Sequence, residues 1–390
     1  MTSMAIHSFM LLLLFVTMHQ SSAESSPSSS PYPTPYSSVR AAYWPSGSDF
    51  STSSINTNYF THIYYAFLEP DPADSFRLSV TGSAQTEITN FISGLRNRNP
   101  PVKTLLSIGG GSSNSSAFAA MASTPQSRSV FIKSTIQVAR HYGFDGLDLD
   151  WEFPDTPQDM SNLALLFQEW SRALVLDSRT QRKPRLLLTA AVYYANTIKL
   201  IGNQSRSYPA EAIRKYLDWA SPMNFDYHGA WSNFTGVNAA LFDPKSNIST
   251  HYGIGSWIRA GVPPSKLVMG LPLYGRTWKL EDPNVHGIGA PAVGPATDTD
   301  GTMDYDRILE FNKENGATVV YDGLSVSYYS YAGTSWITYD DVRSIKRKVQ
   351  FARSLGLNGY FFGPLIRTWI GPSPDKLQIH GLEGTKLLAI

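Results

Sequence analysis

Hydrophobic residues along this chain gather into short, nearly continuous runs that alternate with longer segments of mixed character. Such runs are typical of parallel strands buried on both faces. The longer segments, such as 127–142 and 159–176, have the spacing of amphipathic helices. We identify eight strand-like runs, at residues 39–44, 61–68, 102–108, 144–153, 185–193, 217–225, 267–273 and 357–362. Eight strand–helix units in roughly 330 residues predict an α/β fold, a (β/α)8 TIM barrel with functional groups at the carboxyl ends of its strands.

One connection is too long for a simple barrel loop. Residues 279–338 separate the seventh and eighth runs, and they contain two further strand-like stretches, 318–321 and 324–331. We predict a small α+β insertion that forms one wall of a cleft. The alternative fold, a doubly wound open sheet, is disfavoured because the sequence lacks a Gly-rich phosphate loop.

The N-terminal residues predict a targeting segment rather than structure. Residues 10–16 are apolar and Ser21-Ser22-Ala23 follows, so we expect residues 1–23 to be a signal peptide. Residues 24–38 are a Ser/Pro-rich leader, and residues 371–390 are expected to be an irregular tail after the domain at 39–370. Four glycosylation sequons support a secretory route, to the extracellular space or the vacuole, and begin at Asn114, Asn203, Asn233 and Asn247.

Composition and charge exclude several classes of partner. The net charge is +1 and no basic cluster stands out, so nucleic acid and membranes are not expected partners, and we expect a monomer. The chain has no cysteine, so its stability depends on its core. His228 stands apart from other metal-binding residue types, and no metal or other cofactor is expected. The 21 Tyr, 19 Phe and 9 Trp suit a carbohydrate cleft, and they suit a well-filled core equally well.

The most informative segment is Asp145-Gly146-Leu147-Asp148-Leu149-Asp150-Trp151-Glu152, at the end of the fourth predicted strand. Alternation along a strand puts Asp148, Asp150 and Glu152 on one face. The simpler interpretation is an edge strand with a solvated acidic face. Strands disfavour Asp, however, and neighbouring like charges repel. Carboxyl groups that share protons resolve this conflict and provide a general acid, so we favour a catalytic role.

These residues also carry a resemblance to a known family. Asp145, Asp148, Asp150 and Glu152 complete the pattern Asp-x-x-Asp-x-Asp-x-Glu of the family 18 glycoside hydrolases. Supporting matches are Ser107-Ile108-Gly109-Gly110, Gly270-Leu271-Pro272-Leu273-Tyr274-Gly275-Arg276 and Trp336-Ile337-Thr338-Tyr339-Asp340-Asp341. From about residue 39 to about residue 365 the chain resembles the plant class V chitinases of this family.

The resemblance implies a chitinase mechanism that acts on chitin or chito-oligosaccharides without a metal. Glu152 would protonate the glycosidic oxygen, and the substrate's own 2-acetamido oxygen would attack the anomeric carbon. Asp150 would orient the acetamide, Asp148 would exchange a proton with Asp150, and Asp145 would be structural. The residues expected to bind substrate are Met223, Asp226, Tyr227, Tyr274, Arg276 and Trp278. For Asp226, the simpler alternative is a capping Asp in the next turn.

Two departures from the family pattern favour a weak enzyme. Phe225 stands where the family has a Tyr whose hydroxyl donates to the attacking oxygen, although Tyr227, on the same strand face, could partly substitute. Losing such a donor typically costs roughly 100- to 1000-fold in rate. Gly363 stands where the family has a Trp beneath the reacting sugar. The alternative function is therefore a carbohydrate-binding lectin on an inactive chitinase scaffold.

The remaining aromatic residues divide between cleft and core. Tyr43, Trp44, Tyr64, Tyr65 and Phe67 lie on the first two strands, and we expect one or two of them to line the cleft. Three tryptophans are predicted to be packing residues: Trp231, Trp257 and Trp336.

Overall fold

The computed structural model describes residues 38–48, 50–199, 205–297 and 300–364. The predicted signal peptide, the leader up to residue 37 and the predicted tail therefore lie outside the described residues. In the part of the chain that the structure describes, no helix is both long enough and apolar enough to cross a membrane.

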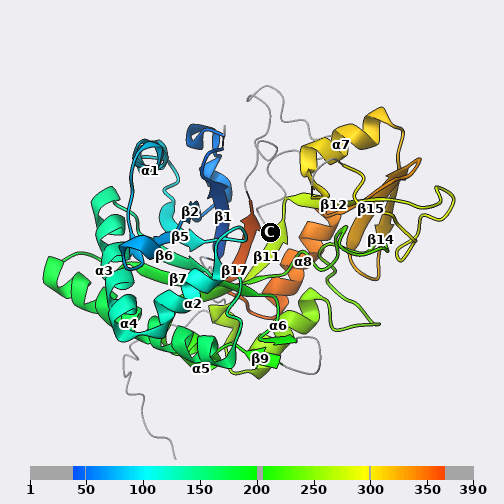
Figure 1. The fold of residues 1–390 in the computed structure, drawn as a ribbon. Helices are drawn as coiled ribbons and strands as arrows, with labels where there is room; N and C mark the ends of the chain where they lie inside the picture. Colours follow the sequence, from blue (N-terminus) through cyan, green and yellow to red (C-terminus); the bar gives the residue numbers. More distant parts are fainter. Residues whose placement is uncertain (1–37, 49, 200–204, 298–299, 365–390) are drawn as a thin grey trace, which may run out of the picture. The chain divides into compact units, whose positions relative to one another are not determined.

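The eight predicted strands are all present and form one parallel sheet (Figure 1). They are β1 (Val39–Pro45), β2 (His62–Leu68), β5 (Lys103–Gly109), β6 (Gly146–Asp150), β7 (Leu187–Tyr193), β10 (Trp219–Met223), β11 (Val268–Pro272) and β17 (Gly359–Gly363). Their order in the sheet is β10-β7-β6-β5-β2-β1-β17-β11. A parallel bridge between Ala220 and Leu267 joins the two ends, so the sheet nearly closes. The prediction of a (β/α)8 barrel is confirmed.

Helices follow most of the strands, and their ends carry clear sequence signals. The helices of the barrel are α1 (Ser83–Arg96), α2 (Ser115–Ser123), α3 (Pro125–Tyr142), α4 (Pro157–Gln181), α5 (Ala210–Tyr216), α6 (Thr250–Arg259) and α8 (Val342–Ser354). The two amphipathic stretches singled out in the sequence are α3 and α4. Helix α4 begins with a capping box between Thr156 and Asp159, and α3 ends at Gly143 with a φ of +85°.

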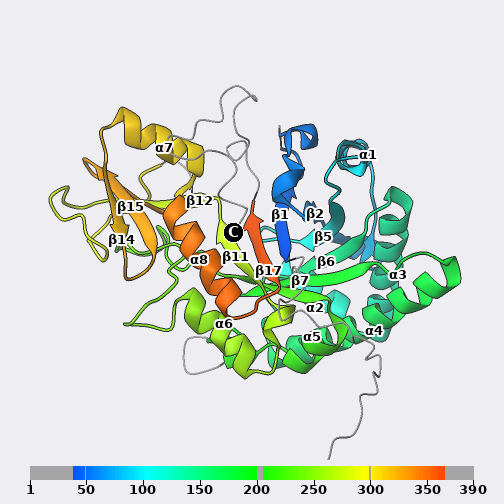
Figure 2. The same ribbon diagram turned by 180° about the vertical axis from the view of Figure 1, so that it is seen from behind.

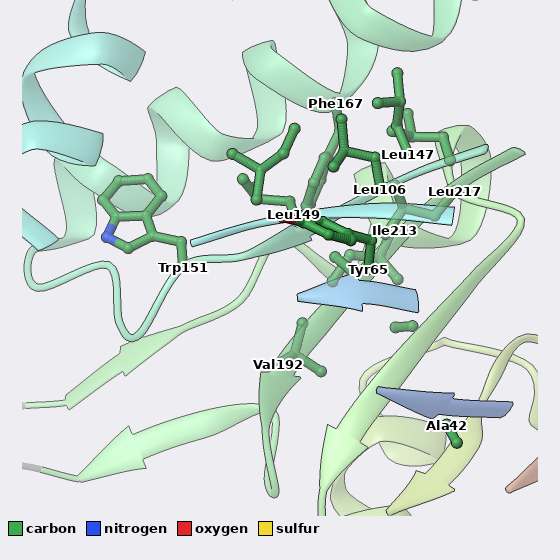
Figure 3. Packing of buried hydrophobic residues seen from close by; sticks show 14 of the residues in the cluster. Ala42, Tyr65, Leu106, Leu147, Leu149, Trp151, Phe167, Val192, Ile213 and Leu217 are labelled. Atoms are coloured by element: carbon green, nitrogen blue, oxygen red, sulfur yellow. The ribbon is translucent and has the colours of Figure 1, made fainter. Parts of the chain in front are cut away.

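Side chains of β6 alternate between two environments, as its sequence predicts. Leu147 and Leu149 point outward into the apolar layer between the sheet and the helices, where Figure 3 shows them near Leu106 and Phe167. The alternate residues of β6 point into the barrel. Other inward-facing residues there form a separate apolar cluster that includes Tyr43, Tyr64 and Phe361. The helices therefore cover one face of the strand and leave its carboxylates to the interior.

The insertion between β11 and β17 is an antiparallel sheet with one helix, which Figure 2 shows from the other side. Its elements are β12 (Tyr274–Lys279), β13 (Thr302–Asp304), α7 (Tyr305–Glu314), β14 (Thr318–Asp322), β15 (Ser327–Ala332) and β16 (Ser335–Tyr339). The predicted bounds of 279–338 were too narrow, because β12 pairs with β16 from Arg276↔Thr338 to Lys279↔Ser335. The insertion therefore begins directly after the seventh barrel strand. Two short hairpins complete the strands: β3 (Pro70–Asp71) with β4 (Arg77–Leu78), and β8 (Thr197–Lys199) with β9 (Ser205–Ser207).

Candidate active site

Asp148 lies in the barrel interior, fully buried, and accepts three hydrogen bonds from hydroxyl groups. The donors are Tyr43 Oη at 2.9 Å, Ser107 Oγ at 2.7 Å and Thr189 Oγ1 at 2.5 Å, and they come from β1, β5 and β7. Burial raises the pKa of Asp148, and these hydroxyl donors lower it in opposition. The solvated-face interpretation of the acidic strand is therefore wrong, because this carboxylate is buried and held by hydroxyl groups of three other strands.

Asp150 is the next inward-facing residue and is also buried, but its surroundings differ. Its Oδ1 atom is buried and has no hydrogen-bond partner among the described residues. Burial, and then the charges of Glu152 and Asp148, raise the pKa of Asp150 well above its ordinary value. Asp150 is therefore expected to be protonated at neutral pH, with one carboxyl oxygen available to a ligand.

Glu152 follows the end of β6 and faces a cavity of about 460 Å³. Burial, and then the charge of Asp226, raise the pKa of Glu152 to about 7. A carboxyl group with this pKa is protonated often enough near neutral pH to act as a general acid. Asp145, at the other end of the segment, accepts a hydrogen bond from the backbone N–H of Thr104 at 2.8 Å, in line with a structural role.

Asp226 lies just beyond β10 and is held by two residues of β12. Tyr274 Oη donates to Asp226 Oδ2 at 2.8 Å, and Arg276 Nε donates to Oδ1 at 2.8 Å. Asp226 has a φ of +57°, in the left-handed region that non-glycine residues rarely occupy. The carboxylate caps no helix, so the simpler alternative for this residue is wrong. Its contacts place a negative charge where it acts on Glu152.

The cavity brings together four of the nine residues predicted for catalysis and substrate binding. Met223 and Tyr274 line it together with Asp150 and Glu152. Of the five aromatic residues on the first two strands, two line it: Tyr43 and Phe67. Both departures from the family pattern also lie in the cavity wall. A Cβ atom added at Gly363 would lie 3.6 Å from Phe225 Cζ, so the two altered positions adjoin each other.

Tyr227 lies away from this cavity. Strand β10 ends at Met223, and the left-handed turn at Asp226 breaks the alternation that put Tyr227 on the same face as Phe225. The Tyr227 ring packs against Val237 and Ala240, and its hydroxyl lies 3.1 Å from Thr250 Oγ1. In contrast to the prediction, Tyr227 is a packing residue and does not replace the hydroxyl missing from Phe225.

Two tryptophans differ from their predicted environments: the one expected in the cleft is buried, and one expected in the core is exposed. Trp278 is fully buried in the insertion, with its ring 5.4 Å from that of Trp336, so it is a core residue and not a cleft residue. Trp231 was expected to pack inside, but it is 63% exposed, and the guanidinium carbon of Arg276 lies 5.2 Å from its ring. The prediction holds for Trp257 and Trp336, which are fully buried. Trp231 thus adds an exposed aromatic face beside Arg276, which is the ion-pair partner of Asp226.

The arrangement supports proton transfer and the binding of a neutral polar ligand. It combines a carboxyl group of raised pKa, a second carboxyl group with an unpartnered oxygen, and an apolar wall of aromatic rings. Within the described ranges, no group of three or more His, Asp or Glu residues is arranged to hold a metal ion. That the chemistry needs no metal stays a prediction.

The sequence and the fold match those of a known class of proteins. The sequence pattern of glycosyl hydrolases family 18 matches residues 39–362, and the chain belongs to this family. Among curated relatives, the class V chitinase CHIT5 of Lotus japonicus is 67% identical over 324 residues, which cover 83% of this chain and 81% of the relative. The resemblance to plant class V chitinases is therefore confirmed.

Two solved structures represent the two functions that the sequence left open. A mutant class V chitinase from Nicotiana tobaccum in complex with NAG4 has a TM-score of 0.80 and 40% identity, covering 84% of this chain and 94% of that one. The chitinase-like agglutinin RobpsCRA from Robinia pseudoacacia has a TM-score of 0.76 and 41% identity, covering 83% of this chain and 94% of that one. Overall likeness does not separate the two functions, so the residues of the site must.

Proposed function

We propose that this protein is a chitinase-type hydrolase that cleaves β-1,4 bonds between N-acetylglucosamine units with the help of the substrate's own acetamido group. The observation that carries the proposal is the contrast between Asp150 and Glu152. The pKa of Glu152 is raised to about 7, which suits a general acid, and buried Asp150 keeps an unpartnered oxygen beside it. The tetrasaccharide complex of the similar tobacco enzyme supports the substrate class.

In the proposed mechanism, Glu152 gives its proton to the glycosidic oxygen as the bond to the anomeric carbon breaks. The acetamido oxygen of the same sugar attacks that carbon and forms an oxazolinium ion. Asp150 Oδ1 accepts the acetamide N–H, and this contact strengthens as positive charge develops on the ring. Glu152, now ionised, then takes a proton from a water molecule, whose oxygen attacks the anomeric carbon. This attack breaks the bond from that carbon to the acetamido oxygen, opens the oxazolinium ring and restores the acid.

Asp148 supports this cycle by keeping the charge of the cluster tolerable. Asp148 and Asp150 can share one proton, which moves to Asp148 when Asp150 binds the acetamide. Burial raises the pKa of Asp148 and so allows it to take this proton, whereas the three hydroxyl donors favour its carboxylate form when the proton returns. The proposed mechanism uses no metal, because the acetamido group of the substrate supplies the nucleophile and Asp150 supplies the stabilising carboxylate.

We infer that the activity is weak, because two contributions to the reacting subsite are missing. Phe225 lines the cavity without a hydroxyl to donate to the acetamido oxygen, and Tyr227 lies elsewhere. Gly363 offers no aromatic face beneath the sugar. Burial of one such side chain is worth about 1.5–3 kcal/mol, so ground-state binding at this subsite should also be weaker.

A lectin remains the second candidate, favoured by Phe225, Gly363 and the likeness to the agglutinin. Against it stands the intact acidic set. Carboxyl groups buried this deeply cost stability, which favours a catalytic role for them over a purely structural one.

We also propose that the protein follows the secretory route, to the extracellular space or the vacuole. The support is the apolar N-terminal segment together with the sequons. Asn114, Asn233 and Asn247 are exposed in the structure, whereas Asn203 lies outside the described residues. A loss of mass on treatment with an N-glycosidase, at peptides that contain these residues, would test the proposal. Unmodified peptides from a secreting plant cell would contradict glycosylation at these positions.

The experiment that tests the hydrolase is a mass-spectrometric time course with N-acetylglucosamine hexamer. We compare the wild type with Glu152→Gln and, as a matched control, with Glu69→Gln, since Glu69 is an exposed glutamate that lines the same cavity. Shorter oligomers from the wild type and Glu69→Gln, with at least about 1000-fold less from Glu152→Gln, support the proposal. An intact hexamer in all three samples, with binding detected by calorimetry, identifies a lectin. Equal turnover by Glu152→Gln contradicts the assignment of the general acid.

A further inference from the structure

We propose that Asn238 is a positioning residue for the reaction, which fixes Asp226 and Tyr274 relative to Glu152 and so couples the insertion to the acidic strand. The effect on the reaction rests on the proposed function, whereas the contacts of Asn238 do not depend on it. Asn238 lies between β10 and α6, outside every motif that the sequence analysis singled out, and it is 1% exposed.

The Asn238 side chain joins two parts of the site through both ends of its amide. Its Oδ1 accepts a hydrogen bond from the backbone N–H of Asp226 at 3.0 Å, and its Nδ2 donates to the backbone carbonyl of Tyr274 at 3.4 Å. Asp226 and Tyr274 also meet directly, through the hydroxyl and the carboxylate. The buried side-chain amide of Asn238 thus binds the backbones of both Asp226 and Tyr274, whose side chains also bind each other. An amide is suited to this position because it offers a donor and an acceptor together.

Asn238 also holds the turn that aims the Asp226 side chain. Its backbone carbonyl accepts from the N–H of Tyr227 at 2.9 Å, so two consecutive N–H groups, of Asp226 and Tyr227, are bound by Asn238. Between them lies the left-handed conformation of Asp226, which is uncommon for residues with a Cβ atom, although Asp adopts it more readily than most. The two hydrogen bonds to Asn238 hold Asp226 in this conformation.

The backbone around Asn238 is itself held from two sides. The backbone N–H of Asn238 donates to Thr338 Oγ1 of β16 at 3.4 Å. The next carbonyl, of Ala239, accepts from Lys348 Nζ of α8, and this lysine forms a buried ion pair with Asp340. Asn238 is therefore fixed by the last strand of the insertion and by the last described helix of the barrel. A displacement of β12 or β16 would reach Asp226 through it.

The consequence for the chemistry follows from the charge of Asp226. This carboxylate is the charged group that raises the pKa of Glu152, after burial itself. The other titratable groups that interact with Glu152 are Asp150 on its own strand, Tyr274 on β12 and Tyr208 before α5. Arg276 acts on the same region through its ion pair with Asp226. If Asp226 leaves its position, Glu152 should lose its proton at lower pH.

The test measures the pH dependence of hexamer cleavage in Asn238→Leu and Asn238→Asp. Asn238→Leu removes both hydrogen bonds, and we expect kcat to fall about tenfold or more, KM to change less than about threefold, and the alkaline limb of kcat/KM to move down by about half a pH unit or more. Asn238→Asp keeps the acceptor for the Asp226 N–H, and any charge it adds opposes ionisation of Glu152. Its alkaline limb should therefore stay in place or move up.

Asn162→Leu is the matched control, because Asn162 is a buried asparagine of α4 that accepts a hydrogen bond from Gln158. It should leave the alkaline limb unchanged even if it lowers stability. A fall in kcat for Asn238→Leu with no movement of the limb would reduce Asn238 to a structural residue and overturn the proposal. If Asn238→Leu does not fold, a downward shift in Asn238→Asp overturns it equally.

A second readout separates this proposal from the function on which it rests. NMR titration of ¹³C-labelled glutamate carboxyl groups, with the Glu152 signal assigned by its loss in Glu152→Gln, reports the pKa without any turnover. An inactive wild type with a shifted Glu152 signal in Asn238→Leu would overturn the hydrolase and support the positioning role. An active wild type with an unshifted signal would do the reverse.

Discussion

Asp148 and Asp150 are the same residue type two positions apart on one strand, and their surroundings give them different roles. Asp148 receives three hydroxyl donors, whereas Asp150 keeps a buried oxygen without a partner among the described residues. Burial raises the pKa of both groups, but only at Asp148 do hydroxyl donors oppose the rise, so the two carboxyl groups can take different roles. The surroundings of single residues, and not the overall fold, therefore distinguish a hydrolase from a lectin.

Phe225→Tyr should raise the activity of the protein. The new hydroxyl would stand at the cavity wall, where it can donate to the acetamido oxygen as that oxygen attacks. Recovering one preorganised donor of this kind should increase kcat by about 10- to 100-fold. The measurement is initial-rate kinetics on the hexamer, with Phe225→Leu as a control that changes shape without adding a donor. An unchanged or lower kcat in Phe225→Tyr would show that the missing hydroxyl does not limit the reaction.

The spacing of the acidic residues predicted the three carboxyl groups of the site, because alternation along a single strand is a local property. The groups that tune them could not be predicted in this way. Tyr43, Ser107 and Thr189 come from three different strands and meet Asp148 only through the register between β1, β5, β6 and β7. The exposure of Trp231 and the burial of Trp278 also depend on tertiary packing.

At the scale of elements, all eight barrel strands could be predicted, since buried parallel strands leave continuous apolar runs in the sequence. Their ends were harder to predict. The sixth run was expected to continue to Phe225, whereas β10 ends at Met223 and is followed by the turn at Asp226. Tyr227 was misplaced for this reason. The bounds of the insertion were misjudged because the pairing of β12 with β16 joins segments far apart in the chain.

Helix α8 should be held in place by the ion pair between Lys348 and Asp340, whose side chains are each 1% exposed. Lys348→Met would leave the Asp340 carboxylate buried without a counter-charge, and it should lower the free energy of unfolding by about 3–5 kcal/mol. Urea unfolding checks this. The double variant Asp340→Leu/Lys348→Met removes both charges and should recover most of the loss. A cost below about 1 kcal/mol for the single variant would contradict a role for this pair.

At the scale of the whole molecule, the acidic cluster should make folding stability depend on pH. The pKa values of Asp148, Asp150 and Glu152 are all raised in the folded state. Between roughly pH 4 and pH 7 these three groups therefore hold more protons in the folded chain than in the unfolded chain. By linkage, their contribution to the free energy of unfolding falls as pH rises through this range.

Glu152→Gln should remove part of this dependence, because glutamine does not ionise. The difference in the free energy of unfolding, variant minus wild type, should increase by about 1–3 kcal/mol from pH 4.5 to pH 8. This is the size expected for one group whose pKa is raised to about 7. Denaturant unfolding at the two pH values measures the gain, with Glu69→Gln as the control for the substitution itself. A gain that is zero, or that has the opposite sign, would show that Glu152 is not held protonated by its surroundings.

The most direct test of the account is the configuration of the first product. Proton NMR during the first minutes of reaction with N-acetylglucosamine hexamer resolves the two anomers at the newly formed reducing end, before they interconvert. The acetamido oxygen attacks the face opposite the leaving group, and water then attacks the face opposite the acetamido oxygen. The two inversions retain the β configuration, so an initial excess of the β-anomer is expected. An initial excess of the α-anomer would contradict substrate assistance, and no product at all would leave Asp148, Asp150 and Glu152 without the catalytic role assigned to them.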